Sequence, residues 1–381
     1  MASDLVVVGG GPAGASLARA VRGLSVVLIA QERRAVRASD DLDARVYALT
    51  PGNVGFLRDI KAWQAMPEER VAPVRAMRIF GDDGASVLEF DAYRAGVPEL
   101  AWIVEDALLQ DALWRDLDVE ICAPAQLEQL EIQASKITLS LRGGAAIESK
   151  LVVGADGARS FVRERAGIVA TESDYGQAAV VANFACTKPH FDTAYQWFQG
   201  GPVLALLPLP GERVSMVWSL PLAGSERIAA LSPQELCREV ERASRGVLGD
   251  LSLITAQRTF VLRRLSARTM IAPRVALVGD AAHVIHPLAG QGLNLGLQDA
   301  RALAATLAAR EPMRDPGDSR LLRRYERSRA EPILAMDAMV HGLFRLFGAE
   351  SRFLSRLRNT GLNLTDRVPV LKNILMRQAM N

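Results

Sequence analysis

Short apolar runs alternate with glycine turns and helical patterns near the start of the chain. Asp4–Val8 is a β-branched run that ends at the sequence GGGPAG, residues 9–14. A helical pattern follows over residues 15–23, and a second apolar run spans Ser25–Ala30. Strand, glycine turn, helix and strand in this order predict the first unit of a Rossmann-like, nucleotide-binding fold.

The glycine turn has the residues that a bound pyrophosphate requires. Gly9 permits a tight turn, Gly11 lets the backbone approach the phosphates, and Gly14 lets the helix pack on the strand. The unsatisfied N–H groups at the helix N-terminus attract the anionic phosphates. An acidic residue for the adenosine ribose is expected about twenty residues further on, where Glu32 lies. The turn predicts a dinucleotide site without distinguishing FAD from NAD.

Two later segments repeat the pattern of a strand that ends in a glycine turn. Residues 151–163 read LVVGADGARSFVR, with Asp156 and Gly157 on the turn. Residues 275–299 read VALVGDAAHVIHPLAGQGLNLGLQD, in which Gly279 and Asp280 precede a glycine-bearing loop and a helix. With a GxGxxG, a DG and a GD motif in this order, the sequence resembles the flavin-dependent aromatic hydroxylases, the group A flavoprotein monooxygenases.

A narrower resemblance is to the ubiquinone-biosynthesis flavin hydroxylases. Residues 43–49 (DARVYAL) resemble their D-x-R-x-x-A-L segment, and residues 286–304 resemble their GD region. Residues 325–331 (YERSRAE) and the C-terminal residues are similar to that subfamily's pattern, although Asp106 stands where it usually has Asn. The resemblance covers nearly the whole chain and implies an FAD-dependent aromatic-ring monooxygenase.

The resemblance also implies the architecture. We expect an α/β fold with a Rossmann-like FAD-binding domain, an inserted antiparallel-sheet substrate domain and a helical C-terminus. Apolar runs such as VLALLPL and RVSMVWSL, with one helix over Pro233–Arg245, agree with the inserted sheet. The expected parts are a discontinuous FAD-binding domain over residues 1–72, 98–172 and 271–345, a substrate domain over 73–97 and 173–270, and a C-terminal helical tail over 346–381.

Carried over position by position, the resemblance implies which residues contact the cofactor. Arg45 would face the phosphate and ribityl region, Gln110 would touch FAD from a helix, and Asp280 would bind a ribityl hydroxyl. The backbone of residues 290–294 would lie against the isoalloxazine ring. The full expected set of cofactor-binding residues is Gly9, Gly11, Pro12, Ala13, Gly14, Glu32, Arg33, Arg45, Gln110, Asp156, Asp280, Pro287, Gly290, Gln291, Gly292, Leu293 and Asn294.

Several polar side chains near these motifs also allow other roles. Arg45 as an ordinary surface arginine and Asp280 as a helix cap stay open. His283 and His286 form an H-x-x-H pair, but no third ligand accompanies them at metal-site spacing, so we expect no metal. Ser160 lacks the G-x-S-x-G frame of a hydrolase nucleophile and is expected to begin a helix. No residue of the expected substrate domain stands out as a base, so no catalytic residue is assigned.

The resemblance implies oxygen transfer to an aromatic ring. In the family, reduced FAD reacts with O₂, and a flavin hydroperoxide delivers one oxygen atom; here the ring would belong to a polyprenylated phenol or benzoquinol of ubiquinone biosynthesis. NADH or NADPH is the expected electron donor, docked transiently because no second GxGxxG follows a strand. The alternatives are a hydroxylase of another small phenol, a flavin halogenase, whose W-x-W-x-I-P segment the sequence lacks, and a non-catalytic scaffold of a quinone-biosynthesis complex.

Composition narrows the class of protein. Apolar residues make up 49% of the 381 residues and charged ones 23%, which is typical of a globular protein with a buried core. The net charge of +2 argues against a nucleic-acid partner. Three separate cysteines without a CxxC pair argue against a disulfide framework. No apolar run approaches the ~20 residues that span a bilayer, and we expect no signal peptide, so the predicted location is cytoplasmic.

The C-terminal segment is basic and amphipathic. Residues 342–381 carry seven basic and two acidic side chains, with leucine and phenylalanine between them. Such a segment can lie on the anionic inner membrane as a peripheral contact or dock to a ubiquinone-biosynthesis complex. The alternative is a helix packed on its own domain with a solvated basic face.

Deletion of residues 346–381 tests these alternatives. If the tail is a docking surface, the truncated protein should lose most of its association with membranes or partners in cell fractionation. Unchanged fractionation would favour the packed helix.

Overall fold

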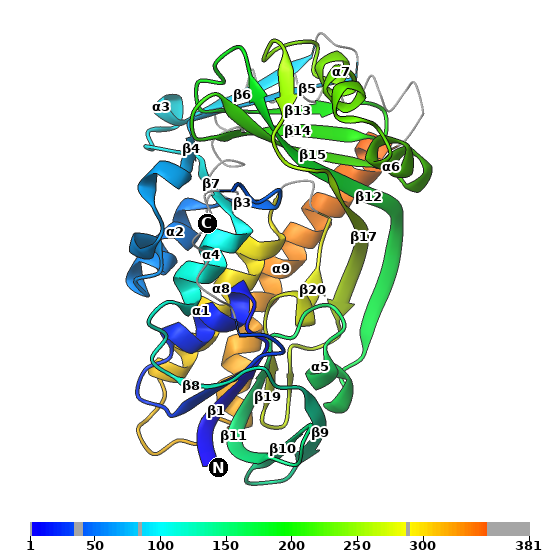
Figure 1. Cartoon of the computed structure of the whole chain (residues 1–381). Helices are drawn as coiled ribbons and strands as arrows, with labels where there is room; N and C mark the ends of the chain where they lie inside the picture. The colour runs from blue at the N-terminus through cyan, green and yellow to red at the C-terminus, as the bar shows by residue number, and fades with distance from the viewer. Residues whose placement is uncertain (1, 34–40, 83–85, 287–289, 349–381) are drawn as a thin grey trace.

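The computed structural model describes residues 2–33, 41–82, 86–286 and 290–348, and these residues form three sheets (Figure 1). The eight-stranded sheet is mostly parallel and lies at the N-terminal end of the molecule. The nine-stranded sheet is mostly antiparallel and lies at the opposite end. A three-stranded sheet contacts strand β14 of the nine-stranded sheet and helix α8. The mixed α/β class predicted from the sequence is confirmed.

The elements have the following bounds. The eight-stranded sheet comprises β1 (Ala2–Val8), β2 (Val26–Ile29), β8 (Glu120–Cys122), β9 (Leu127–Ile132), β10 (Ile137–Leu141), β11 (Ala146–Gly154), β18 (Ile271–Ala272) and β19 (Val275–Leu277). The nine-stranded sheet comprises β5 (Ala76–Phe80), β6 (Val87–Asp91), β12 (Ala170–Cys186), β13 (Thr193–Phe198), β14 (Val203–Leu209), β15 (Arg213–Pro221), β16 (Leu251–Leu253), β17 (Arg258–Ala267) and β20 (His283–Val284). The small sheet comprises β3 (Val46–Leu49), β4 (Ala72–Val74) and β7 (Ala101–Glu105). The α-helices are α1 (Pro12–Ala20), α2 (Pro51–Asp59), α3 (Ala92–Ala95), α4 (Asp106–Trp114), α5 (Phe161–Arg165), α6 (Leu222–Ala229), α7 (Pro233–Ala243), α8 (Gly292–Ala308) and α9 (Ser319–Gly348), and the 3-10 helices are η1 (Trp63–Ala65), η2 (Glu68–Arg70) and η3 (Gly279–Ala281).

The parallel sheet brings the three sequence motifs to one edge. Strand β1 pairs in parallel with β11, and β11 pairs in parallel with β19. In this register Val8, Gly154 and Leu277 are neighbours, and each is the last residue of its strand. The GxGxxG, DG and GD turns therefore leave the sheet side by side. The strands are buried on both faces, which is why they read as continuous runs of valine and leucine.

The nine-stranded sheet has two different faces. One face forms a separate hydrophobic core with α6 and α7. Residues on the other face alternate with those core residues along each strand. Strands β12 and β17 are long and run from this sheet along the side of the molecule toward α5 (Figure 1).

The structure differs from the sequence prediction in some details. Helix α7 occupies the predicted helical segment, but the separate helix α6 precedes it and was not predicted. The sequence of α6 has a glycine and begins directly after a strand, so its pattern is short and weak. Gln110 lies on a helix as expected, in α4, which begins at Asp106 directly after β7. The predicted division into two domains and a tail stays a prediction, and most of the tail lies outside the described residues.

Helix α9 connects the two ends of the molecule (Figure 1). Its Tyr325 is fully buried, and the phenol O–H donates to the carbonyl of Leu277 at 2.8 Å. Further along α9, Asp337 accepts from the guanidinium of Arg264 on β17 at 2.9 and 2.5 Å. Within the described part of the chain, no helix is both long and apolar enough to cross a membrane.

Replacing Tyr325 with Phe should destabilise the protein by about 1–2 kcal/mol, because the buried Leu277 carbonyl would lose its donor. A thermal melt of the FAD-loaded protein measures the effect as a lower Tm. Tyr93→Phe is the matched control, since Tyr93 is 92% exposed and its removal should leave the Tm unchanged. Equal Tm values for both variants would contradict the role given to the Tyr325 hydroxyl.

Candidate active site

A cavity of about 630 Å³ lies between the edge of the parallel sheet and the nine-stranded sheet. The glycine turns of the first motif and of the GD motif line one side, and residues of the nine-stranded sheet line the other. Of the predicted cofactor-binding residues, those that line the cavity are Gly11, Pro12, Ala13, Arg45, Gln110, Asp280, Gly290, Gly292 and Leu293. Residues from each of the three motifs thus reach a single cavity, since Ala155 and Gly157 of the DG turn line it as well.

The three turns pack so closely that side chains would not fit between them. A Cβ on Gly9 would lie 2.2 Å from the Ala155 carbonyl oxygen, and a Cβ on Gly14 would lie 2.0 Å from the Gly9 carbonyl oxygen. Gly9 also has a φ of +113°, which favours glycine. At Gly11 a Cβ would meet no atom within 4 Å, so the backbone there is open to the cavity. This geometry agrees with the tight turn expected at Gly9 and the close packing expected at Gly14, and it leaves the Gly11 backbone open to the cavity.

The first turn leads into the N-terminus of α1. Gly11 is the N-cap and has no side chain to satisfy the first N–H groups, and Pro12 occupies the first helical position. The free N–H groups and the positive end of the helix dipole favour an anion at this place. The cavity reaches Gly11, Pro12 and Ala13, so an anionic group such as a pyrophosphate fits there.

Polar side chains from β3 and α4 lie on the same side of the cavity. The Tyr47 hydroxyl donates to Asp106 Oδ1 at 3.2 Å, and Gln110 Nε2 donates to the same oxygen at 2.6 Å. The Oε1 atom of Gln110 is buried and has no partner among the described residues. A buried acceptor of this kind calls for a donor from a bound molecule or from water. Gln110 is therefore well placed to accept from a cofactor hydroxyl.

Arg45 lines the cavity, and its side chain is still solvent-accessible there. Its guanidinium lies 5.3 Å from the ring centre of Tyr47 and 5.5 Å from that of Phe260. Burial alone would lower the pKa of Arg45, but the nearby Tyr47 and the carboxylates of Asp106 and Asp280 raise it. A guanidinium at this place suits the phosphate and ribityl region predicted for Arg45.

Asp280 lies in η3 with its side chain open to the cavity. Burial raises the pKa of its carboxyl above the usual value, and His283 and Arg45 oppose that shift. The N-cap of η3 is Val278, so the alternative that Asp280 caps the helix is wrong. Its place at the end of β19 agrees with a role in binding a cofactor hydroxyl.

A buried ionic cluster next to Asp280 stabilises the GD turn. Asp299 on α8 accepts from the backbone N–H of Gly279 at 3.0 Å, from His283 Nε2 at 2.6 Å and from Arg329 Nε at 2.7 Å. Burial alone would raise the pKa of Asp299, but His283 and Arg329 bring it below the usual value. Burial alone would lower the pKa of His283, and Asp299 raises it. The cluster ties the GD turn, α8 and α9 together.

Sequence reasoning missed this cluster. From the sequence, neither Asp299 nor Arg329 is assigned to a site. The three side chains come from residues 283, 299 and 329, and no local pattern joins them. His286, the second histidine of the H-x-x-H pair, is buried and lies 3.2 Å from Gln177 Oε1, and burial lowers its pKa to about 4. The two histidines therefore have separate partners.

Other predicted residues lie away from the cavity or use their side chains within the protein. Glu32 and Arg33 follow β2, are exposed and do not line the cavity, and Gln291 is the N-cap of α8 without a side-chain cap. Asp156 accepts from the Val162 N–H at 3.1 Å and from Ser160, which is the N-cap of α5 as predicted. The Asn294 side chain accepts from Thr50 N and donates to the Ala48 carbonyl. Pro287 lies outside the described residues.

The side of the cavity formed by the nine-stranded sheet is nearly all apolar. Its lining residues in this sheet are Met77, Ala179, Val181, Gln196, Ala205, Leu207, Val217, Phe260, Val261, Leu262 and Val284. A site with one polar side rich in backbone N–H groups and one apolar side can bind a large anionic cofactor next to an apolar ring.

Comparison with known proteins identifies the family. A family profile described as an FAD binding domain matches residues 2–338. Ubiquinone hydroxylase UbiL of Rhodospirillum rubrum is 33% identical over 99% of this chain and 89% of its own length. The 3-demethoxyubiquinol 3-hydroxylase of Escherichia coli is also 33% identical, over 99% of this chain and 98% of its own length. The chain belongs to the ubiquinone-biosynthesis flavin hydroxylase family.

Solved structures share the fold of this family member. The structure of PqsL from Pseudomonas aeruginosa in complex with 2-aminobenzoylacetate matches with a TM-score of 0.79 and 23% identity, over 93% of this chain and 99% of that one. A structure of HpxO from Klebsiella pneumoniae complexed with FAD matches with a TM-score of 0.77 and 18% identity, over 98% of this chain and 99% of that one. The chain is an FAD-dependent monooxygenase, and the glycine turns, the α1 N-terminus and the unpartnered Gln110 oxygen fit FAD.

Replacing Asp280 with Ala should yield protein that is mostly free of FAD, because the cavity would lose its acceptor beside the GD turn. The ratio of flavin to protein absorbance after gel filtration measures the loss. Asp118→Ala is the control, since Asp118 is exposed and does not line the cavity. A fully FAD-loaded Asp280→Ala protein would show that the assignment of this carboxylate is wrong.

Proposed function

We propose that this monooxygenase hydroxylates the aromatic ring of a polyprenylated phenol or benzoquinol in ubiquinone biosynthesis. The names of relatives at 33% identity over nearly the whole chain support this substrate class. The observation that carries the proposal is the cavity itself, in which an apolar sheet faces glycine turns suited to FAD. An apolar ring with a lipid tail fits the sheet side better than a charged metabolite does.

The residues of the chain position the reactants and keep water out. The α1 N-terminus and Arg45 would hold the phosphates of FAD, while Gln110 and Asp280 would bind its ribityl hydroxyls. FAD bound there would supply, once reduced, the two electrons that activate O₂, and one oxygen atom of the O₂ would go to the ring. The apolar residues of the sheet, such as Val181 and Val217, would exclude water from the place where the ring reacts.

The electron donor in this proposal is NADH or NADPH. No second GxGxxG follows a strand in the sequence, so the nicotinamide would dock transiently near FAD instead of occupying a domain of its own. The proposed location is the cytoplasm, with the basic C-terminal tail as the contact to the inner membrane or to a ubiquinone-biosynthesis complex.

Complementation of bacterial strains that each lack one ring hydroxylase of ubiquinone synthesis tests the function. The wild-type gene should restore ubiquinone in at least one strain, with loss of the stalled intermediate in mass spectra, because the missing ring oxygen is then supplied. Asp280→Ala should fail in the same strain, since the protein would lack FAD.

Rescue of one strain would identify the ring position, and rescue of several would indicate a cavity with loose regiospecificity. If a soluble, FAD-loaded protein rescues none of the strains, the proposal is wrong, and a hydroxylase of another phenol or a scaffold takes its place. NAD(P)H oxidation by the purified protein then separates these two.

A further inference from the structure

One polar side chain interrupts the apolar sheet side of the cavity. Along β13 successive side chains point to opposite faces, so Gln196 faces the cavity while Trp197 packs in the core beneath α7. Every other described residue of the nine-stranded sheet that lines the cavity has an apolar side chain. Among the described residues with which the nine-stranded sheet lines the cavity, Gln196 therefore has the side chain that can form a hydrogen bond with a substrate.

Gln196 ends a row of small apolar residues that crosses the sheet. In the strand register it neighbours Ala205 on β14, which neighbours Val217 on β15 and then Val181 on β12. All four residues line the cavity, and adjacent strands lie roughly 4.8 Å apart. The small side chains leave room for a flat ring along the row, with the Gln196 amide at one end.

We propose that Gln196 anchors a neutral oxygen substituent of the substrate ring, a hydroxyl or methoxy group, and so determines how the ring lies against the row. This inference rests on the proposed function and adds a specificity-determining residue to it. A primary amide is uncharged and offers both a donor and an acceptor, which suits a phenol or its ether. The charged side chains that line the cavity do not come from the nine-stranded sheet: Arg45 lies directly before β3, Asp106 is in α4 and Asp280 is in η3.

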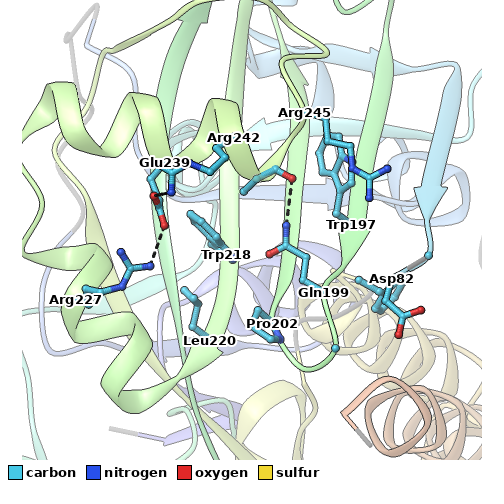
Figure 2. A pocket seen from close by; sticks show the side chains of 14 residues that line it. Asp82, Trp197, Gln199, Pro202, Trp218, Leu220, Arg227, Glu239, Arg242 and Arg245 are labelled. Carbon is cyan, nitrogen blue, oxygen red and sulfur yellow. Dashed lines mark hydrogen bonds and ion pairs between the residues drawn. The ribbon is translucent and has the colours of Figure 1, made fainter. Parts of the chain in front are cut away.

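The opposite face of the same sheet supplies a matched control (Figure 2). Gln199 lies directly after β13, and its side-chain amide donates to the Ala243 carbonyl at the end of α7 at 3.1 Å. Gln199, Trp197 and Trp218 line a second pocket of about 580 Å³. This pocket shares no lining residue with the cavity beside the glycine turns. Gln199→Leu therefore makes the same chemical change on the same stretch of chain, outside the proposed substrate site.

The experiment compares Gln196→Leu with Gln199→Leu in FAD-loaded protein. The ligands are 2-prenylphenol and prenylbenzene, which differ only in the ring hydroxyl. Binding is followed by the change in the flavin absorbance spectrum. Wild type and Gln199→Leu should bind the phenol about three- to ten-fold more tightly than the hydrocarbon. Gln196→Leu should lose this preference while it keeps its FAD content and binds the hydrocarbon at least as well as wild type.

The outcomes separate the two claims. If wild type prefers the phenol and Gln196→Leu keeps the same preference, the anchor is wrong although the proposed function stands. If wild-type protein binds neither ligand, both the anchor and the proposed function are wrong. A preference that both glutamine variants lose equally would also contradict the anchor, because the effect would then be a general one on the sheet.

Discussion

Close approach of backbone segments without side chains is the constraint on which the site depends. Gly9, Gly14 and Ala155 pack so tightly that a Cβ on either glycine would lie 2.0–2.2 Å from a carbonyl oxygen. Gly279 approaches the same place, where its Cβ would lie 3.1 Å from that of Ala13. Because the strands β1, β11 and β19 end in register, all three turns can meet. Their meeting leaves the backbone N–H groups at the α1 N-terminus open to the cavity, where they would face the phosphates of FAD.

Other parts of the molecule stabilise the three turns at the edge of the parallel sheet and cover the cavity beside them. The ionic cluster of Asp299, His283 and Arg329 holds the GD turn from below and connects it to α8 and α9. The nine-stranded sheet covers the cavity with apolar side chains from one face, while its other face is buried under α6 and α7. In the proposed function, the backbone of the turns and the polar side chains beside them would bind the cofactor, and the sheet would bind the substrate.

Much of this arrangement could be predicted from local sequence. Strand endings and glycine spacing predict the first βαβ unit and the DG and GD turns. They also predict that Gly11, Pro12 and Ala13 line the site. The ionic cluster could not be predicted, because its members are far apart in sequence and each is ordinary in its own segment. The small sheet was missed because its strands, such as β4 (Ala72–Val74), are too short to show alternation. Gln196 stood inside an apolar run, and only the strand register reveals which face it shares with Val217.

Isotope labelling tests the central claim most directly. Purified, FAD-loaded protein would be incubated with a short-chain prenyl phenol, NADH or NADPH and ¹⁸O₂, and the product analysed by mass spectrometry. A monooxygenase of this family should give a ring-hydroxylated product in which one new oxygen is ¹⁸O, since the atom comes from O₂ and not from water. Oxidation of the nicotinamide without any labelled product, under conditions in which the phenol binds, would contradict the account.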